Sequence, residues 1–381
     1  MRRTLLLTLA CLLGVHPLSA QAAPPSLRTY FADASKLKEG GVKVIPIQTP
    51  KGPFKVWTKR FGHNPRIKVL LLHGGPGGTH EVFESFEGFL PVEGIEFIYY
   101  DQLGSGNSDQ PKDRDLWTTA RFVEEVEQVR LALGLNKDNF YLLGHSWGGI
   151  LAAEYALKYG ANLKGLVISN MMMSIPDYNR YAEQVLAKQM PPEVVKEIKA
   201  LEAAGKYEDP RYFELLQPHY YAQHLCRLPQ WPDAINRMFG RLNKDIYVLM
   251  QGPSEFGASG RLEQWDRKAD LPKLAMPTLV IAAAHDTMEP AHMQWVSKQV
   301  QHGSYLLCPD GSHCAMWDDQ RGPHPGPAPG EAPDGVHQQE GHETEAEAGH
   351  QGSGRGGQRG ARRTVLRPPS VPFSHASRPG K

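Results

Sequence analysis

At 381 residues, the chain is long enough to bury a sizeable hydrophobic core in one large domain or in two. Its 42 lysines and arginines nearly balance 41 aspartates and glutamates, which leaves a formal net charge of +1. A charge this small gives no electrostatic reason to expect a nucleic acid as partner.

The first 22 residues differ in character from the rest of the chain. Arg2 and Arg3 precede an apolar run from Leu5 to Val15, and Ala20-Gln21-Ala22 follows that run. A charged start, an apolar run and a small-residue cleavage site are the three parts of a secretory signal peptide. The apolar run is too short to persist as a membrane-spanning helix. We therefore expect residues 1–22 to be cleaved as a signal peptide, which predicts a secreted or periplasmic protein without stable membrane insertion.

Three cysteines remain after that cleavage, namely Cys226, Cys308 and Cys314. An odd number of cysteines scattered over a large domain does not form a disulfide framework, and no cluster has metal-ligand spacing. We expect the three thiols to pack in the interior, and the sequence implies neither a metal nor an organic cofactor.

Strand and helix patterns alternate through the first half of the chain. Two β-rich runs, Val42–Ile47 and Phe54–Thr58, flank a turn rich in proline and glycine and predict a hairpin. The next expected elements are strands at Lys68–Leu72, Glu96–Tyr100, Phe140–Leu143 and Leu163–Ser169, and helices at Thr118–Leu133 and Gly149–Lys158. Near-continuous apolar strands that alternate with helices predict a mostly parallel sheet with helices on both faces.

The alternation stops at Asn170. From Met171 to about Lys268 the segments are helical, rich in Tyr, Met, Gln and Trp, and without a buried-strand pattern. The alternation resumes with the expected strand Pro277–Ala283, helix Ala291–Val300 and strand Ser304–Cys308. The sequence therefore predicts an α/β core, residues 41–170 and 269–319, that is interrupted by a helical cap at 171–268.

The composition changes abruptly after Asp319. Residues 321–381 are dominated by Gly, Pro, Arg, His and Glu, and they contain few large apolar side chains. Such a segment cannot bury enough apolar surface to offset the entropy lost on ordering. We expect residues 321–381 to form a disordered, low-complexity tail.

The most specific motif in the chain is Gly144-His-Ser-Trp-Gly148. A short apolar run leads into it and a helical pattern follows at once, which predicts a strand, a sharp turn and a helix with Ser146 at the apex. Gly144 and Gly148 lack Cβ atoms where such a turn brings the strand and helix backbones together. An ordinary serine in a glycine-rich turn is the alternative, but the flanking elements favour a nucleophile.

A serine hydroxyl is a weak nucleophile until a base accepts its proton. His313, in the loop after the last expected core strand, is the candidate base. Asp286, at the carboxyl end of the preceding strand, is the candidate acid that orients the imidazole, with Asp310 and Glu289 as alternatives. These positions converge because ligands of parallel sheets bind outside the carboxyl ends of the strands. The chain order Ser, Asp, His is that of α/β-hydrolases.

A hydrolase of this kind also needs donors for the oxyanion that forms during acyl transfer. The expected donors are the backbone N–H of Trp147 and that of Gly75, in the glycine-rich loop after the first core strand. This loop lacks the Gly-Lys-Ser/Thr ending of a phosphate-binding loop. We expect His73, His145 and His285 to be structural.

Four motifs, taken together, resemble those of the proline iminopeptidase (prolyl aminopeptidase) family of the α/β-hydrolase superfamily. They are His73-Gly-Gly-Pro-Gly-Gly78, Asp101-Gln-Leu-Gly-Ser-Gly-Asn-Ser108, Gly144-His-Ser-Trp-Gly-Gly149 and Gly311-Ser-His313. The resemblance extends from about Val42 to Asp319. It implies an α/β-hydrolase fold with a helical cap, and a serine peptidase that releases an N-terminal residue, preferably proline, from small peptides through an acyl-enzyme.

The resemblance also implies that carboxylates in the cap bind the free α-amine of the substrate. Glu255, in Gln251-Gly-Pro-Ser-Glu-Phe256, is similar to one such position, and a second acidic position falls at Gln223. Two alternatives stay open. One is an esterase or amidase that uses the same serine, histidine and aspartate. The other is an inactive product, because the unusual tail stands where the family has a further helix packed on the sheet.

Overall fold

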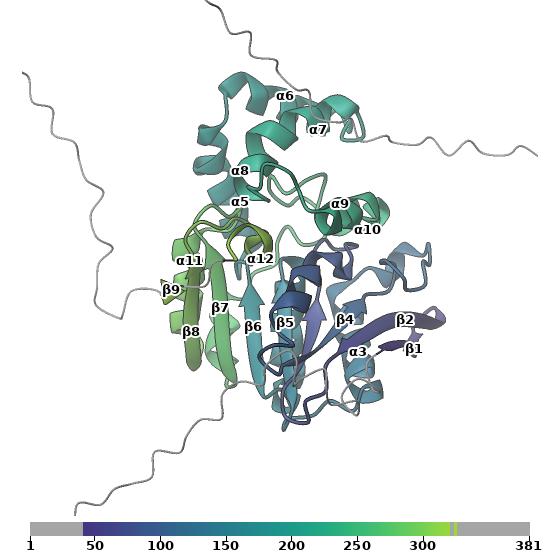
Figure 1. Cartoon of the computed structure of the whole chain (residues 1–381). Helices are drawn as coiled ribbons and strands as arrows, with labels where there is room; N and C mark the ends of the chain where they lie inside the picture. Colours follow the sequence, from purple (N-terminus) through teal and green to yellow (C-terminus); the bar gives the residue numbers. More distant parts are fainter. Residues whose placement is uncertain (1–40, 321–323, 326–381) are drawn as a thin grey trace, which may run out of the picture. The chain divides into compact units, whose positions relative to one another are not determined.

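The computed structural model describes residues 41–320 and the backbone of residues 324–325. The predicted signal peptide and nearly all of the predicted tail lie outside the described residues. The centre is a sheet with the strand order β1-β2-β4-β3-β5-β6-β7-β8-β9 (Figure 1). Its strands are β1 (Gly41–Thr49), β2 (Gly52–Phe61), β3 (Lys68–Leu72), β4 (Glu96–Asp101), β5 (Phe140–His145), β6 (Gly165–Ser169), β7 (Pro277–Ala283), β8 (His302–Cys308) and β9 (His324–Pro325).

The sheet is mostly parallel, as the sequence predicts. β1 and β2 form the predicted hairpin, with Thr49 opposite Gly52 at its turn. β2 joins β4 in antiparallel fashion, and all pairs from β4 across to β8 are parallel. Only the two-residue strand β9 returns to an antiparallel arrangement, against β8.

Helical elements cover both faces of the sheet because successive side chains of a strand point to opposite faces. Leu70 and Leu72 belong to one apolar cluster, which also contains residues of α3 (Thr119–Ala132), α4 (Trp147–Tyr159) and α11 (Pro290–Gln299). Leu71, between them, belongs to a second cluster with residues of the 3₁₀ segment η1 (His80–Gly88) and of α9 (Asp233–Gly240). The predicted packing of helices on both faces is therefore confirmed.

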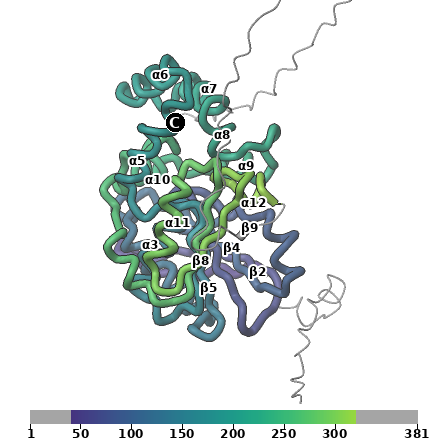
Figure 2. The backbone as a smooth tube through the Cα atoms, turned by 90° about the vertical axis from the view of Figure 1, so that its left-hand side faces the viewer, coloured from purple at the N-terminus to yellow at the C-terminus, as the bar shows by residue number. Residues whose placement is uncertain are grey.

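The chain between β6 and β7 consists of helices joined by loops, and its described residues contain no strand apart from an isolated bridge between Ser174 and Asp266. Its remaining α-helices are α5 (Ile175–Gln184), α6 (Pro192–Ala203), α7 (Pro210–Leu216), α8 (Ala222–His224) and α10 (Lys244–Met250). The aromatic and aliphatic side chains of α6, α7 and the residues after them form an apolar cluster of their own. Figures 1 and 2 show α5–α8 beyond the carboxyl ends of the parallel strands, above the edge where the predicted site residues lie.

Among the described residues, no helix is both long enough and apolar enough to cross a bilayer.

Candidate active site

Ser146 lies in the turn between β5 and α4 with φ 56° and ψ −129°. Positive φ values are uncommon for residues other than glycine and signify local strain. The flanking glycines make this turn possible, because a Cβ atom on Gly144 would lie 1.9 Å from the carbonyl oxygen of Gly148. A Cβ atom on Gly148 would lie 2.0 Å from the carbonyl oxygen of Leu72. The expected strand, sharp turn and helix around Ser146 are thus present in the structure.

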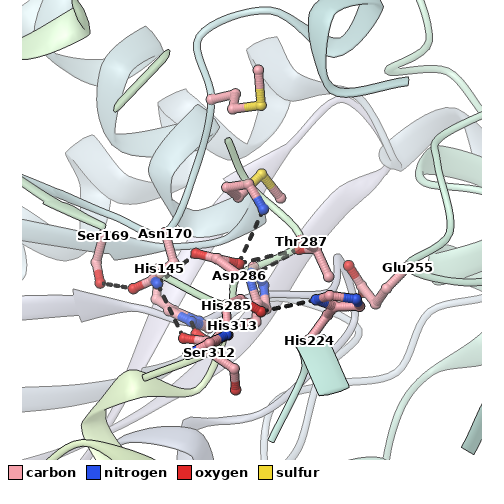
Figure 3. A network of polar contacts seen from close by, with 12 residues as sticks. His145, Ser169, Asn170, His224, Glu255, His285, Asp286, Thr287, Ser312 and His313 are labelled. Atoms are coloured by element: carbon pink, nitrogen blue, oxygen red, sulfur yellow. Dashed lines mark hydrogen bonds and ion pairs between the residues drawn. The ribbon is translucent and has the colours of Figure 1, made fainter. Parts of the chain in front are cut away.

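His313 and Asp286 form a buried hydrogen-bonded pair (Figure 3). Nδ1–H of His313 donates to Oδ1 of Asp286 over 2.8 Å, and the two residues are 3% and 1% exposed. This bond fixes the proton of the neutral imidazole on Nδ1 and leaves Nε2 as the basic nitrogen. Nε2 is buried and has no hydrogen-bond partner among the described residues. The pair has the geometry of a general base with its orienting carboxylate.

The two alternative acids do not occupy this position. The backbone N–H of Asp310 donates to Asp319, and the backbone N–H of Glu289 contacts the sulfur of Met172. Neither carboxylate has a hydrogen bond to His313, whereas Asp286 does. The structure therefore brings Asp286, of the three candidates, to the imidazole.

Asn170 holds the other side of Asp286. Its Nδ2 donates to Oδ2 of Asp286 over 2.6 Å, while the backbone N–H of Met288 donates to Oδ1 over 3.1 Å. Asn170 has φ 53°, and its backbone N–H bonds to the carbonyl of Ile281 in the neighbouring strand β7. Our sequence reasoning assigned no role to Asn170. The available signal was its place directly after β6, where a side chain reaches the same edge of the sheet as Asp286.

The pKa of His313 is raised above its ordinary value. Burial opposes the charged imidazolium, but the adjacent carboxylate of Asp286, through charge and hydrogen bonding, outweighs that effect. His145, next to Ser146, behaves in the opposite way. Its Nε2–H donates to the carbonyl oxygen of His313 over 2.8 Å, and burial lowers its pKa to about 3. His145 is therefore a neutral residue that supports the loop of His313.

Ser146 and His313 face a common small cavity of about 40 Å³. It is lined by Gly74, Gly75, Gly78, Val82, His145, Ser146, Leu225, Met238, Phe239, Leu242, Tyr247, Glu255, His313 and Cys314. Most of the side chains that come from the cap are apolar. A larger cleft of about 380 Å³ has residues of α10 in its wall, among others. Ser146 and His313 do not line this cleft. The reactive groups are therefore confined to the smaller cavity.

Of the two expected oxyanion donors, Gly75 lines the same cavity as Ser146, and Trp147 follows Ser146 directly in the chain. Gly75 has φ 114°, precedes a cis peptide bond to Pro76, and lines the cavity. Trp147 is the first residue of α4, so its backbone N–H has no acceptor within the helix. Its indole is turned away and donates to Oε1 of Gln102 over 2.9 Å. Only the backbone of Trp147 is thus available for an oxyanion.

Glu255 is the only carboxylate among the residues that line the cavity. The hydroxyl of Tyr247 donates to its Oε1 over 2.6 Å, and the hydroxyls of Tyr178 and Tyr220 donate to its backbone carbonyl. Burial raises the pKa of Glu255, and the negative charge of Asp286 adds to this effect. The three tyrosines fix this acidic group at a defined point of the wall, where the other side chains that come from the cap are mostly apolar.

Gln223 does not reach this cavity. It lies on α8 with an exposed side chain, and it is absent from the residues that line the cavity. The structure therefore does not bring Gln223 together with Glu255, and the role in substrate binding expected for it remains a prediction without structural support.

The cysteines Cys226, Cys308 and Cys314 are buried free thiols, and Cys314 contributes to the cavity wall. No group of three or more His, Cys, Asp or Glu side chains within the described part of the chain could hold a metal ion.

Comparisons with known proteins agree with this fold and with the motifs. The family model of the alpha/beta hydrolase fold matches residues 68–320. The proline iminopeptidase of Flavobacterium johnsoniae is 63% identical over 278 residues, which cover 73% of this chain and 94% of that relative. The proline iminopeptidase of Elizabethkingia meningoseptica is 62% identical over 280 residues, with the same shares covered.

Solved structures give the same result. The crystal structure of a proline iminopeptidase from Mycobacterium smegmatis has a TM-score of 0.64 and 30% identity, covering 72% of this chain and 92% of that one. The crystal structure of VinJ has a TM-score of 0.67 and 30% identity, covering 72% of this chain and 93% of the other. The chain therefore belongs to the proline iminopeptidase family of the α/β-hydrolase superfamily.

Proposed function

We propose that this protein is an exported serine hydrolase that releases an N-terminal residue, preferably proline, from small peptides or amides through an acyl-enzyme. The observation that carries this proposal is one small cavity that combines Ser146, the His313–Asp286 pair and the buried carboxylate of Glu255. Membership of the proline iminopeptidase family supports the prolyl aminopeptidase activity. The apolar run and cleavage site in residues 1–22 support export.

In the first half of the reaction, Oγ of Ser146 attacks the carbonyl carbon of the N-terminal residue. Nε2 of His313 accepts the hydroxyl proton, and Asp286 stabilises the resulting imidazolium. The N–H groups of Gly75 and Trp147 donate to the oxyanion of the tetrahedral intermediate. The imidazolium then gives its proton to the leaving amine, the C–N bond breaks, and the shortened peptide departs.

In the second half, a water molecule attacks the ester between Ser146 and the acyl group. His313 accepts a proton from this water and returns it to Oγ as the C–O bond breaks. The products are the free amino acid and the original enzyme. The steps use the side chains of Ser146, His313 and Asp286, the two backbone N–H groups and water.

Glu255 supplies the requirement for a free N-terminus. The protonated α-amine of the substrate, a secondary ammonium in N-terminal proline, carries a positive charge, and no other carboxylate of the described residues lines the cavity beside Glu255. An ammonium that leaves water needs such a partner, because burying an unpaired charge is costly. The cavity wall near Phe239 and Leu242 is apolar and suits the pyrrolidine ring of proline. A longer chain on the N-terminal side would meet the Glu255 wall, which favours removal of one residue at a time.

The function is tested by labelling the purified protein with a fluorophosphonate probe and then assaying a chromogenic proline amide. Labelling that is lost in Ser146→Ala, together with turnover of the proline amide, is the expected result. If Ser146→Ala labelled and turned over like wild type, the assignment of the nucleophile would be wrong. Fractionation of cells that produce the full chain tests export, and an uncleaved cytoplasmic protein would contradict that part.

An esterase or amidase on the same residues is the second candidate. The exposed position of Gln223 favours it, because Glu255 then acts without a second polar partner from α8. A neutral acyl ester, assayed beside the proline amide, separates the two functions. Preference for the ester by kcat/KM would favour the esterase.

A further inference from the structure

The loop that carries His313 is bonded along its main chain to the cap. The backbone N–H of His313 donates to the carbonyl of His224 over 2.9 Å, and that of Cys314 donates to the carbonyl of Leu225 over 2.8 Å. Nδ1–H of His224 donates to the carbonyl of His285, next to Asp286, over 3.0 Å (Figure 3). The cap segment of residues 224–227 therefore runs beside the His313 loop and is bonded to it at consecutive residues.

Asp318, the last residue of α12 (Ala315–Asp318), connects the same two segments through its side chain. Its Oδ1 accepts the backbone N–H of Ser312 over 3.0 Å, and the hydroxyl of Ser312 donates to Oδ2. Oδ2 also accepts the backbone N–H of Arg227 over 2.8 Å. Ser312 is fully buried, so the loop cannot replace these bonds with bonds to water unless it moves. One carboxylate thus holds the residue before His313 and the end of the cap segment.

We propose that Asp318 is a positioning residue that fixes His313 and the cap segment 224–227 as a single unit. This inference rests on the proposed role of His313 as the general base. Asp318 has no place in the cavity wall, so it acts through Ser312 and does not touch substrate. Movement of the cap away from the sheet displaces the base as well, which couples access to the cavity with the readiness of the base to react.

The variant Asp318→Asn tests this with little change in volume. An amide oxygen at the position of Oδ2 can still accept from the Ser312 hydroxyl and from Arg227, but the NH2 group that replaces Oδ1 cannot accept the backbone N–H of Ser312, so this bond is lost and two donors face each other. A displacement of about 1 Å in a reacting group can cost on the order of 100-fold in rate. We expect kcat for the proline amide to fall by about 10- to 100-fold, with KM changed less than about threefold, since Glu255 and the tyrosines bonded to it are unchanged.

Asp319→Asn is the matched control. Asp319 is the next residue, and its Oδ2 accepts the backbone N–H of Asp310, in the same loop, over 2.9 Å. It bonds neither to Ser312 nor to the cap segment. A general requirement for an acidic residue in this loop would lower kcat equally in both variants. Positioning by Asp318 predicts a loss in Asp318→Asn and less than about a twofold change in Asp319→Asn.

The pH dependence of kcat/KM distinguishes a positioning role of Asp318 from general damage to the fold. The charged or titratable groups that affect His313 come from several elements, namely Asp286, Glu255, Asp318 and His145. The charge of Asp318 contributes to the raised pKa of His313, so its removal lowers that pKa. The acidic limb of kcat/KM on a neutral ester should then move to lower pH in Asp318→Asn and stay in place in Asp319→Asn.

Ser312→Ala serves as a second variant if Asp318→Asn fails to fold. It removes the hydroxyl bond and keeps the backbone bond to Oδ1, so a smaller loss of kcat is expected with an unchanged melting temperature. Wild-type kcat in folded Asp318→Asn, or in Ser312→Ala if that is the variant that folds, would overturn the proposal. Full activity of His313→Ala would instead overturn the proposed function. The two failures are therefore distinguishable.

Discussion

Replacing Glu255 by glutamine removes the charge that we assign to amine recognition while keeping the size of the side chain. The amide oxygen can still accept the hydroxyl of Tyr247, which donates to Oε1 over 2.6 Å in the wild type. The bonds from Tyr178 and Tyr220 end on the backbone carbonyl, so they are also kept. The substitution therefore isolates the charge from the structure around it.

The expected loss follows from the burial of this group. Glu255 is 8% exposed, and within residues 41–320 no other carboxylate lines the cavity to take over its role. Removing one partner of a desolvated charge pair typically costs about 2–5 kcal/mol. At about 1.4 kcal/mol per factor of ten, kcat/KM for a proline amide should fall by roughly 30-fold to several thousand-fold. Turnover of a neutral acyl ester should change little, because the ester has no ammonium group for Glu255 to bind.

The pH dependence of kcat/KM is a second test of amine recognition by Glu255. The pKa of Glu255 is raised, so its carboxylate becomes neutral at a higher pH than an ordinary glutamate as the solution is acidified. Its attraction for an ammonium is present above that pKa and is lost below it. The proline amide should therefore show a steeper acidic limb in kcat/KM than the ester, since His313 affects both and Glu255 affects only the amide. In Glu255→Gln the two limbs should have the same slope.

Glu202→Gln is the matched control. Glu202 lies in α6 of the cap, is partly buried, accepts the hydroxyl of Tyr212 and also has a pKa raised by burial. It does not line the cavity, so its substitution should leave both substrates unaffected. Equal loss on amide and ester in Glu255→Gln would mean structural damage. No loss on either substrate would refute amine recognition by Glu255 and favour an esterase.

Further variants test the remaining parts of the site. Ser146→Ala and His313→Ala should each remove nearly all turnover without lowering the melting temperature, and the double variant should be little worse than either, because such residues act as a unit. Asn170→Ala removes the amide that donates to Oδ2 of Asp286 over 2.6 Å. Because a hydrogen bond to a charged group is worth about 1.5–3 kcal/mol, kcat should fall by about 10- to 100-fold. Wild-type kcat in this variant would contradict the orienting role of Asn170. Gly148→Ala places a Cβ atom 2.0 Å from a carbonyl of β3, so circular dichroism should show a lower melting temperature.

Much of the fold is determined by local features of the sequence. Apolar runs that alternate with helical patterns predicted the parallel sheet, and the hairpin of β1 and β2 was recognisable from its turn. The setting of Ser146 is local in part, because a Cβ atom on Gly144 would meet the carbonyl oxygen of Gly148, four residues further on. Each of these predictions rests on a pattern of residues that are close together in the chain, although the strands that then pair are distant.

The partners of His313 depend on contacts between distant parts of the chain. The sequence left Asp286, Asp310 and Glu289 as possible acids, since all three follow β7 or β8. Packing of the loops at the edge of the sheet brings Asp286 to the imidazole, and it brings in Asn170, which is 116 residues away from Asp286 in the chain. The place of Asn170 directly after β6 indicates the shared edge of the sheet, but not the contact with Asp286 itself.

The direction of the Gln223 side chain could not be predicted from the sequence for a different reason. Whether a helical side chain faces a cavity depends on the rotation of its helix, and the segment Gln217–Tyr221 just before α8 is a π-helix. Its i→i+5 hydrogen bonds change the number of residues per turn and therefore the direction of every side chain that follows. A motif can thus specify that an acidic position belongs in this segment, but only the tertiary structure decides that Gln223 is exposed while Glu255 lines the cavity shared with Ser146.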